Sequence, residues 1–122
     1  MSHKDDALSF LRLAAAGRAR EALDKHAAPR FTHHNPYFPA DPAALVKGMD
    51  HNARQYPGKA FDVQRALEDG DFVAVHSRVR MQPADRGIAV VHIFRFEDCR
   101  IAELGDVAQP VPAESTNAGG MF

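Results

Sequence analysis

The chain has 122 residues, of which 45% are hydrophobic and 25% charged, and its formal net charge is −1. This length suits one domain with a single core, and the balanced charge argues against a nucleic-acid-binding surface, which needs clustered excess lysine and arginine. The sequence has no apolar run of about 18 residues and no secretion signal at its start, so we expect a cytoplasmic protein without a membrane span. The single cysteine, Cys99, excludes an internal disulfide.

The first half of the chain predicts three helices. Ser2 or Asp5 can cap a first helix that ends or bends near Gly17. A second, short helix fits residues 19–27, and Pro29 stops it. A polar, proline-rich link, FTHHNPYFPADP, follows, and its closing Asp-Pro pair starts a third helix that runs to about residue 55.

The second half predicts antiparallel strands. Hydrophobic and polar residues alternate from Phe61, and the segments FVAVHSRVRM, IAVVHIFRF and IAELGDVAQPV follow with turn signals between them. Helices followed by a strand meander indicate an α+β fold, with the helices on one face of the sheet. We expect one domain over residues 1–122, with helices at about 3–56, the sheet at about 60–111 and a tail at 112–122.

Strand alternation brings two titratable residues together. Even-numbered positions 88–96 share one face, which is apolar except for His92, and Asp106 shares a face with Leu104 and Ala108 on the next strand. A tight turn near residues 98–99 would make His92 and Asp106 neighbours, and titratable groups on an apolar face are candidates for a site. Asp106 could instead be a turn cap or an ion-pair member, and His92 a core histidine bonded to backbone.

Three further histidines are candidates for the same site. The segment His33-His34-Asn35-Pro36 can place one histidine at a pocket, and the sequence does not decide between His33 and His34. His76 lies within a strand and could be a pocket residue or lie at a subunit contact. Zinc bound by His34, His76 and His92 is conceivable, but no metal-binding spacing supports it.

Four stretches, HHNPYFP, ALEDGDFVAVHSRV, AVVHIFRFEDCRIAELGDVAQPVP and the closing NAGGMF, resemble the SnoaL-like polyketide cyclases. These belong to the nuclear-transport-factor-2-like, or ketosteroid-isomerase-like, superfamily. The resemblance runs from about residue 31 to the end. It implies a cone-shaped α+β fold, the cystatin-like roll, in which three helices pack in the hollow of a strongly curved antiparallel sheet. Dimers through the outer sheet face are common in this superfamily, so we expect a homodimer.

The resemblance also implies a site that needs neither cofactor nor metal. The family's acid/base aspartate for aldol closure maps to Asp106, a supporting histidine to His92, and pocket residues of the HNP segment to His34 and Asn35. Two departures are Leu104 and Gly105, where the family often has His-Trp, and Cys99 in place of a turn glycine. The expected catalytic residues are Asp106, His92 and His34. The expected substrate-binding residues are Asn35, Tyr37, His76, Val90, Phe94 and Leu104.

Two functions remain open at this point. The first is a cofactor-independent lyase or isomerase that takes a proton from the carbon next to a carbonyl of a small hydrophobic substrate. The second is a non-enzymatic module that holds a small hydrophobic ligand in the same cone. An epoxide hydrolase of related fold would need an Asp–Arg–Asp constellation, which the pocket-facing positions do not supply. Neither nucleic acid nor a membrane is an expected partner.

Overall fold

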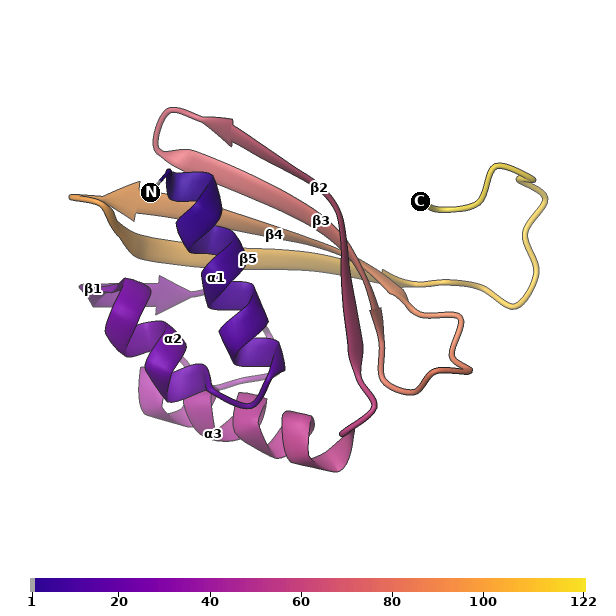
Figure 1. Cartoon of the computed structure of the whole chain (residues 1–122), viewed down its shortest axis with the longest axis horizontal. Coiled ribbons are helices and arrows are strands. Elements are labelled where there is room, and N and C mark those ends of the chain that lie inside the picture. Colours follow the sequence, from indigo (N-terminus) through magenta and orange to yellow (C-terminus); the bar gives the residue numbers. More distant parts are fainter. Residues whose placement is uncertain (1) are drawn as a thin grey trace.

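The computed structural model describes residues 2–122. Five strands form one sheet in the order β1-β5-β4-β3-β2, and the three helices lie against one face of it (Figure 1). This arrangement confirms the predicted α+β fold. The elements in chain order are α1 (His3–Ala15), α2 (Ala19–His26), β1 (Ala27–His33), α3 (Pro42–Gln55), β2 (Ala60–Asp69), β3 (Phe72–Arg80), β4 (Ile88–Glu97) and β5 (Arg100–Pro110).

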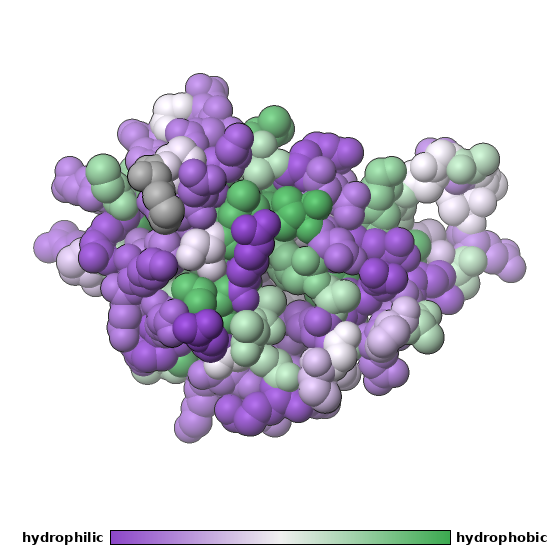
Figure 2. All heavy atoms as spheres, in the orientation of Figure 1, coloured by the Kyte–Doolittle hydropathy of each residue, from purple (hydrophilic) through white to green (hydrophobic). Residues whose placement is uncertain are grey.

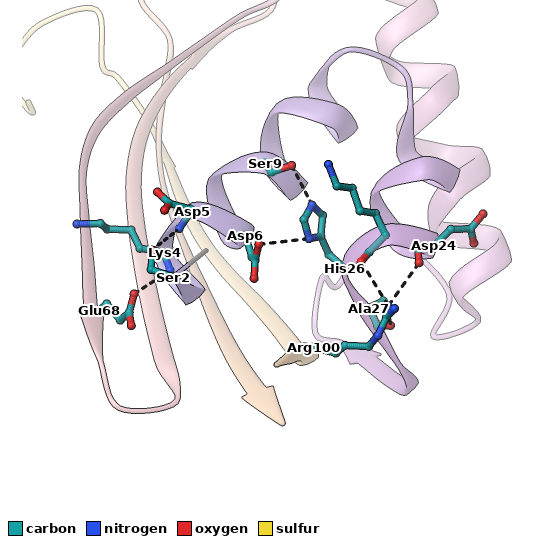
Figure 3. A network of polar contacts seen from close by, with 11 residues as sticks. Ser2, Lys4, Asp5, Asp6, Ser9, Asp24, His26, Ala27, Glu68 and Arg100 are labelled. Atoms are coloured by element: carbon teal, nitrogen blue, oxygen red, sulfur yellow. Dashed lines mark hydrogen bonds and ion pairs between the residues drawn. The ribbon is translucent and has the colours of Figure 1, made fainter. Parts of the chain in front are cut away.

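The helices begin at polar caps. The Ser2 hydroxyl accepts a hydrogen bond from the backbone N–H of Asp5 at the start of α1, and the Asp41 carboxylate accepts one from Ala43 at the start of α3. Gly17 ends α1 with φ of +80°, a conformation that glycine adopts without strain. At the end of α2, the imidazole of His26 is buried and bonds the Ser9 hydroxyl at 2.8 Å, which ties α2 to α1 (Figure 3).

One strand that the sequence did not predict, β1, runs from the end of the predicted second helix into the start of the predicted polar link. β1 follows α2 directly and pairs in parallel with β5, so the sheet is mixed rather than wholly antiparallel. Pro29 is tolerated because β1 is an edge strand, where its missing N–H leaves no ladder bond unmade. The Arg100 guanidinium donates to backbone carbonyls of Asp24, Lys25 and Ala27 and so joins the end of α2 to the start of β5 (Figure 3).

The β4–β5 hairpin sets the register of the predicted pair. Asp98 and Cys99 form its turn with positive φ values of 49° and 64°. Phe96 pairs with Ile101 but Arg95 pairs with Glu103, so the strand β5 bulges at Ala102. This one-residue shift puts His92 directly opposite Asp106, whereas an unbulged hairpin would oppose residue 105. Directly opposed residues of an antiparallel pair share a face, so His92 and Asp106 point the same way.

The two faces of the sheet differ in composition. The inner face carries the core, in which Phe10 of α1 and Leu45 of α3 pack with Val75, Phe94 and Ile101 of the strands. In the view of Figure 2, apolar side chains reach the surface in the middle of the molecule, between α1 and the strands, with polar side chains around them. Within residues 2–122, no helix is both long and apolar enough to cross a membrane.

Candidate functional site

A hollow opens between the inner face of the sheet, α1 and α3. Its wider part has a volume of about 230 Å³ and continues into a narrower part of about 40 Å³. Both parts are lined by Leu11, Asn35, Phe38, Met49 and His92; the wider part adds Ala14, Ala15, Asn52, Lys59, Phe61 and Met81, and the narrower part adds His33, Leu45, Leu104 and Asp106. We call this combined hollow the central pocket. Larger hollows beside α2 and at the loop after β3 are more open to solvent and contain neither His92 nor Asp106.

The carboxylate of Asp106 lies in the narrow part of the central pocket and is held by an amide. The Asn35 side-chain N–H group donates to Asp106 Oδ2 at 2.9 Å. The Asn35 carbonyl oxygen accepts the backbone N–H of Tyr37 at 2.9 Å, so both ends of the amide are assigned by their partners. None of the ion pairs among residues 2–122 includes Asp106. An amide therefore orients this carboxylate without neutralising its charge.

His33, not His34, is the histidine of the HHNP segment that turns inward. His33 is 7% exposed, its Nε2 donates to the Pro39 carbonyl at 2.8 Å, and its Nδ1 accepts the backbone N–H of Asn35 at 3.2 Å. These two bonds require the neutral tautomer with the proton on Nε2. His33 therefore fixes the loop that carries Asn35, and through Asn35 it positions Asp106.

His92 meets Asp106 from the neighbouring strand as a neutral imidazole. Its ring centroid lies 6.0 Å from that of Phe61 and 6.4 Å from that of Phe94. Burial lowers the pKa of His92 to about 4; the Asp106 charge opposes this shift and the Lys59 charge adds to it. The Nδ1 atom is buried and has no hydrogen-bond partner. His92 lines both parts of the pocket, and a neutral imidazole with its proton on Nε2 can donate that N–H to a substrate oxygen.

Lys59 lines the wide part of the pocket and was missed by the sequence reasoning. Its ammonium donates to the Asn52 side-chain oxygen at 2.8 Å, and burial lowers the pKa of the amine. The sequence does indicate its direction, because side chains two residues apart on a strand share a face, and Lys59 precedes Phe61 and Val63 at this spacing. Among the lining residues, Lys59 is the one lysine or arginine and Asp106 the one carboxylate.

The family model described as the SnoaL-like domain matches residues 7–104. The chain belongs to the SnoaL-like domain family. No curated protein matches this SnoaL-like chain. AclR from Streptomyces galilaeus, provisionally named a hydroxylase, is similar in structure, with 22% identity, a TM-score of 0.70 and 88% of each chain covered.

Two further solved structures share the fold of this SnoaL-like protein. A provisionally named polyketide cyclase from Acidithiobacillus ferrooxidans has 22% identity and a TM-score of 0.69, and the match covers 89% of this chain and 92% of that one. A nuclear-transport-factor-2-like protein of unknown function from Cytophaga hutchinsonii has 18% identity and a TM-score of 0.71, with 90% and 92% covered. At these identities the likeness establishes the cystatin-like roll and not a reaction.

Three of the predicted site residues lie outside the central pocket, away from His92 and Asp106. His34 is on the outer face of the sheet, where its side chain is 55% exposed and bonds Glu103. His76 is also on the outer face, because the inward positions of β3 are odd-numbered; it contacts Arg65 and Phe122. Tyr37 is 87% exposed.

His34 and His76 lie on the opposite face of the sheet from His92, and residues 2–122 contain no cluster of three or more His, Cys, Asp or Glu arranged for a metal. Among the predicted apolar lining residues, Leu104 borders the narrow part of the pocket. Val90 and Phe94 share the face of His92 but are buried in the wall behind the pocket surface.

Proposed function

We propose that this protein is a cofactor-independent lyase or isomerase that removes a proton from the carbon next to a carbonyl. The observation that supports it best is the carboxylate of Asp106, held by the Asn35 amide at 2.9 Å and directly opposite the neutral His92. A base of this kind must be oriented, must keep its charge, and must meet its substrate in a space lined mainly by apolar groups. The Asn35 bond occupies Oδ2 and leaves Oδ1 for the substrate proton.

Deprotonation of carbon leaves negative charge on the substrate that the protein must stabilise. As Asp106 takes the proton and becomes a carboxylic acid, negative charge develops on the carbonyl oxygen of the substrate. The N–H of the neutral His92 is the donor for that oxygen, and donors of this kind commonly lower a barrier by about 3–4 kcal/mol. In an isomerisation, Asp106 then returns the proton to a different carbon of the enolate. In an aldol closure, the enolate carbon first attacks a second carbonyl carbon of the substrate, and Asp106 gives its proton to the alkoxide oxygen that this attack forms. The structural likeness to a provisionally named polyketide cyclase favours the aldol route.

The competing function is a binding module that holds a small hydrophobic molecule without transforming it. Both functions use the same pocket, so ligand binding does not separate them. Catalysis of proton transfer separates them, because a module that only binds has no reason to accelerate exchange at an acidic carbon.

The test follows hydrogen–deuterium exchange at the carbon next to the carbonyl of β-tetralone by NMR. We expect the wild-type protein to accelerate exchange and Asp106→Asn to lower the rate at least about 100-fold while keeping the thermal unfolding midpoint. Asp24→Asn, at an exposed position of α2, is the control and leaves the rate unchanged. An Asp106→Asn rate equal to wild type would refute the base assignment. Binding of β-tetralone without any accelerated exchange would favour the binding module.

A further inference from the structure

The ammonium of Lys59 is a cation inside a mostly apolar pocket with no carboxylate beside it. Its one hydrogen-bond partner among residues 2–122 is the neutral side-chain oxygen of Asn52, at 2.8 Å. None of the ion pairs of the described chain includes Lys59. An ammonium group has three N–H donors, so this bond leaves two of them without a protein partner.

The surroundings of Lys59 make this arrangement unfavourable for the free protein. Phe38, Phe61, Met49 and Met81 line the same part of the pocket. Removing a charge from water without pairing it destabilises the charged form, and burial does lower the pKa of this amine. A lysine stem that only covered apolar surface would extend its ammonium to solvent, as lysines usually do. Here the ammonium bonds Asn52 of α3 at the pocket wall instead.

We propose that the central pocket binds hydrophobic molecules that carry a carboxylate, and that Lys59 pairs with this carboxylate. The ligand anion pairs directly with the ammonium, which no carboxylate of the protein does, and accepts hydrogen bonds from the two N–H groups that have no protein partner. Charge-assisted hydrogen bonds of this type are about twice as strong as neutral ones. The proposal deepens the proposed function by naming the substrate class, and it rests on that function only for the position of the reacting carbon.

The layout of the pocket gives the ligand one direction. Lys59 lines the wide part and Asp106 the narrow part, while Asn35 and His92 line both. A carboxylate on the ligand is attracted to Lys59 and repelled by Asp106, so it lies in the wide part. The uncharged end, with its carbonyl, then enters the narrow part, where Asp106 and His92 are. The same charges disfavour the reversed orientation, which would bring two carboxylates together.

The test compares two probes of nearly identical shape, β-naphthoate and β-naphthamide, by isothermal titration calorimetry. We expect wild type to bind the carboxylate at least about 10-fold more tightly than the amide, as one desolvated ion pair would give. Lys59→Met should bring the two affinities within about twofold of each other. Lys47→Met removes a lysine from the exposed side of α3 and should keep the full preference. Lys59→Arg keeps the positive charge and should keep most of the preference for the carboxylate.

The outcomes are separable from those of the proposed function. Asp106→Asn removes the proposed base but keeps Lys59, so its preference for the carboxylate should equal or exceed that of wild type. If wild type fails to accelerate exchange while Asp106→Asn still prefers the carboxylate, that result would support the anion site and refute the proposed reaction. If Lys59→Met does not fold, Lys59→Gln replaces it with a polar side chain that can still bond Asn52. Equal binding of both probes by wild type, or an undiminished preference in the neutral Lys59 variant, would overturn the proposal.

Discussion

Asn35 and Asp106 are 71 positions apart in the chain, and the side-chain amide of one donates to the carboxylate of the other at 2.9 Å. The bond joins the loop after β1 to the middle of β5. Asn35 also closes its own loop, because its side-chain oxygen accepts the N–H of Tyr37. The Asn35 side chain therefore both stabilises the loop after β1 and orients the Asp106 carboxylate.

Asn35→Ala should reduce exchange of β-tetralone about 10- to 100-fold, because the Asp106 carboxylate loses the amide that orients it. The free energy of unfolding should fall by about 1–2 kcal/mol, since two hydrogen bonds are lost. Asn117→Ala removes a similar local turn in the tail, where Asn117 accepts the N–H of Gly119, and controls for the loop effect. Exchange is measured by NMR and stability by urea unfolding. An unchanged rate in Asn35→Ala would show that Asp106 does not need this bond.

The adjacent histidines His33 and His34 should respond very differently to truncation. His33→Ala removes a buried ring together with its bonds to the Pro39 carbonyl and the Asn35 N–H, which should destabilise the protein by about 2 kcal/mol. His34→Ala removes a half-exposed contact with Glu103, and we expect less than about 1 kcal/mol. Urea unfolding of the two variants measures the difference. Equal losses would contradict the assignment of His33 to the inside.

Strand alternation was enough to predict half of the site. His92 and Asp106 share a face because side chains on a strand alternate and because the short turn at Asp98-Cys99 limits the possible registers. The bulge at Ala102 makes their opposition direct, and no local signal in the sequence indicates it. The pairing was thus predictable to within one residue.

The other half of the site depends on long-range pairing that local patterns do not encode. Residues 27–33, AAPRFTH, have a proline, a positive charge and little alternation, and they form a strand because β5 offers them an edge. Once β1 exists, Phe31 and His33 face inward and His34 faces outward. The expectation that His34 lines the pocket beside Asp106 therefore follows from the missed strand. The outward direction of His76 was predictable from strand alternation, because His76 lies an odd number of residues from Val73 and Val75, which are buried.

The buried His92 should make stability depend on pH in a predictable window. Its pKa in the folded protein is about 4, below the ordinary value of 6.5, so between these values the unfolded chain binds more protons than the folded one. The stabilisation from burying the neutral ring is complete above about pH 6.5 and is lost as the pH falls to about 4. Asp106 and Lys59 face the ring with opposite effects, and burial dominates both.

We expect wild type to lose about 2–3 kcal/mol more than His92→Gln between about pH 7 and about pH 4. The comparison cancels other titrating groups, including His26, whose pKa burial also lowers. Urea unfolding at several pH values measures both curves. Parallel curves for the two proteins would mean that His92 is not held neutral by the fold.

The outer face of the sheet carries a row of small and apolar residues, which we propose as the interface of a homodimer. The row crosses β2, β3, β4 and β5, and its members pair directly from each strand to the next: Leu67, Ala74, Ile93 and Gly105. Leu67 is 64% exposed and Ile93 44%, and Val107 on the neighbouring row is 70% exposed. Exposed apolar rows of this kind favour burial against a second surface, and a two-fold axis lets the row pack against its own copy.

Ile93→Lys places a charge in the centre of this row and, in the dimer, brings it close to its symmetry mate. The variant should therefore be monomeric at concentrations where wild type is dimeric, while keeping its unfolding midpoint as a monomer. Ala43→Lys adds the same charge at an exposed position of α3 and should leave the dimer intact. Sedimentation equilibrium measures the masses. A monomeric wild type, or a dimer that tolerates Ile93→Lys, would show that this face does not form the interface.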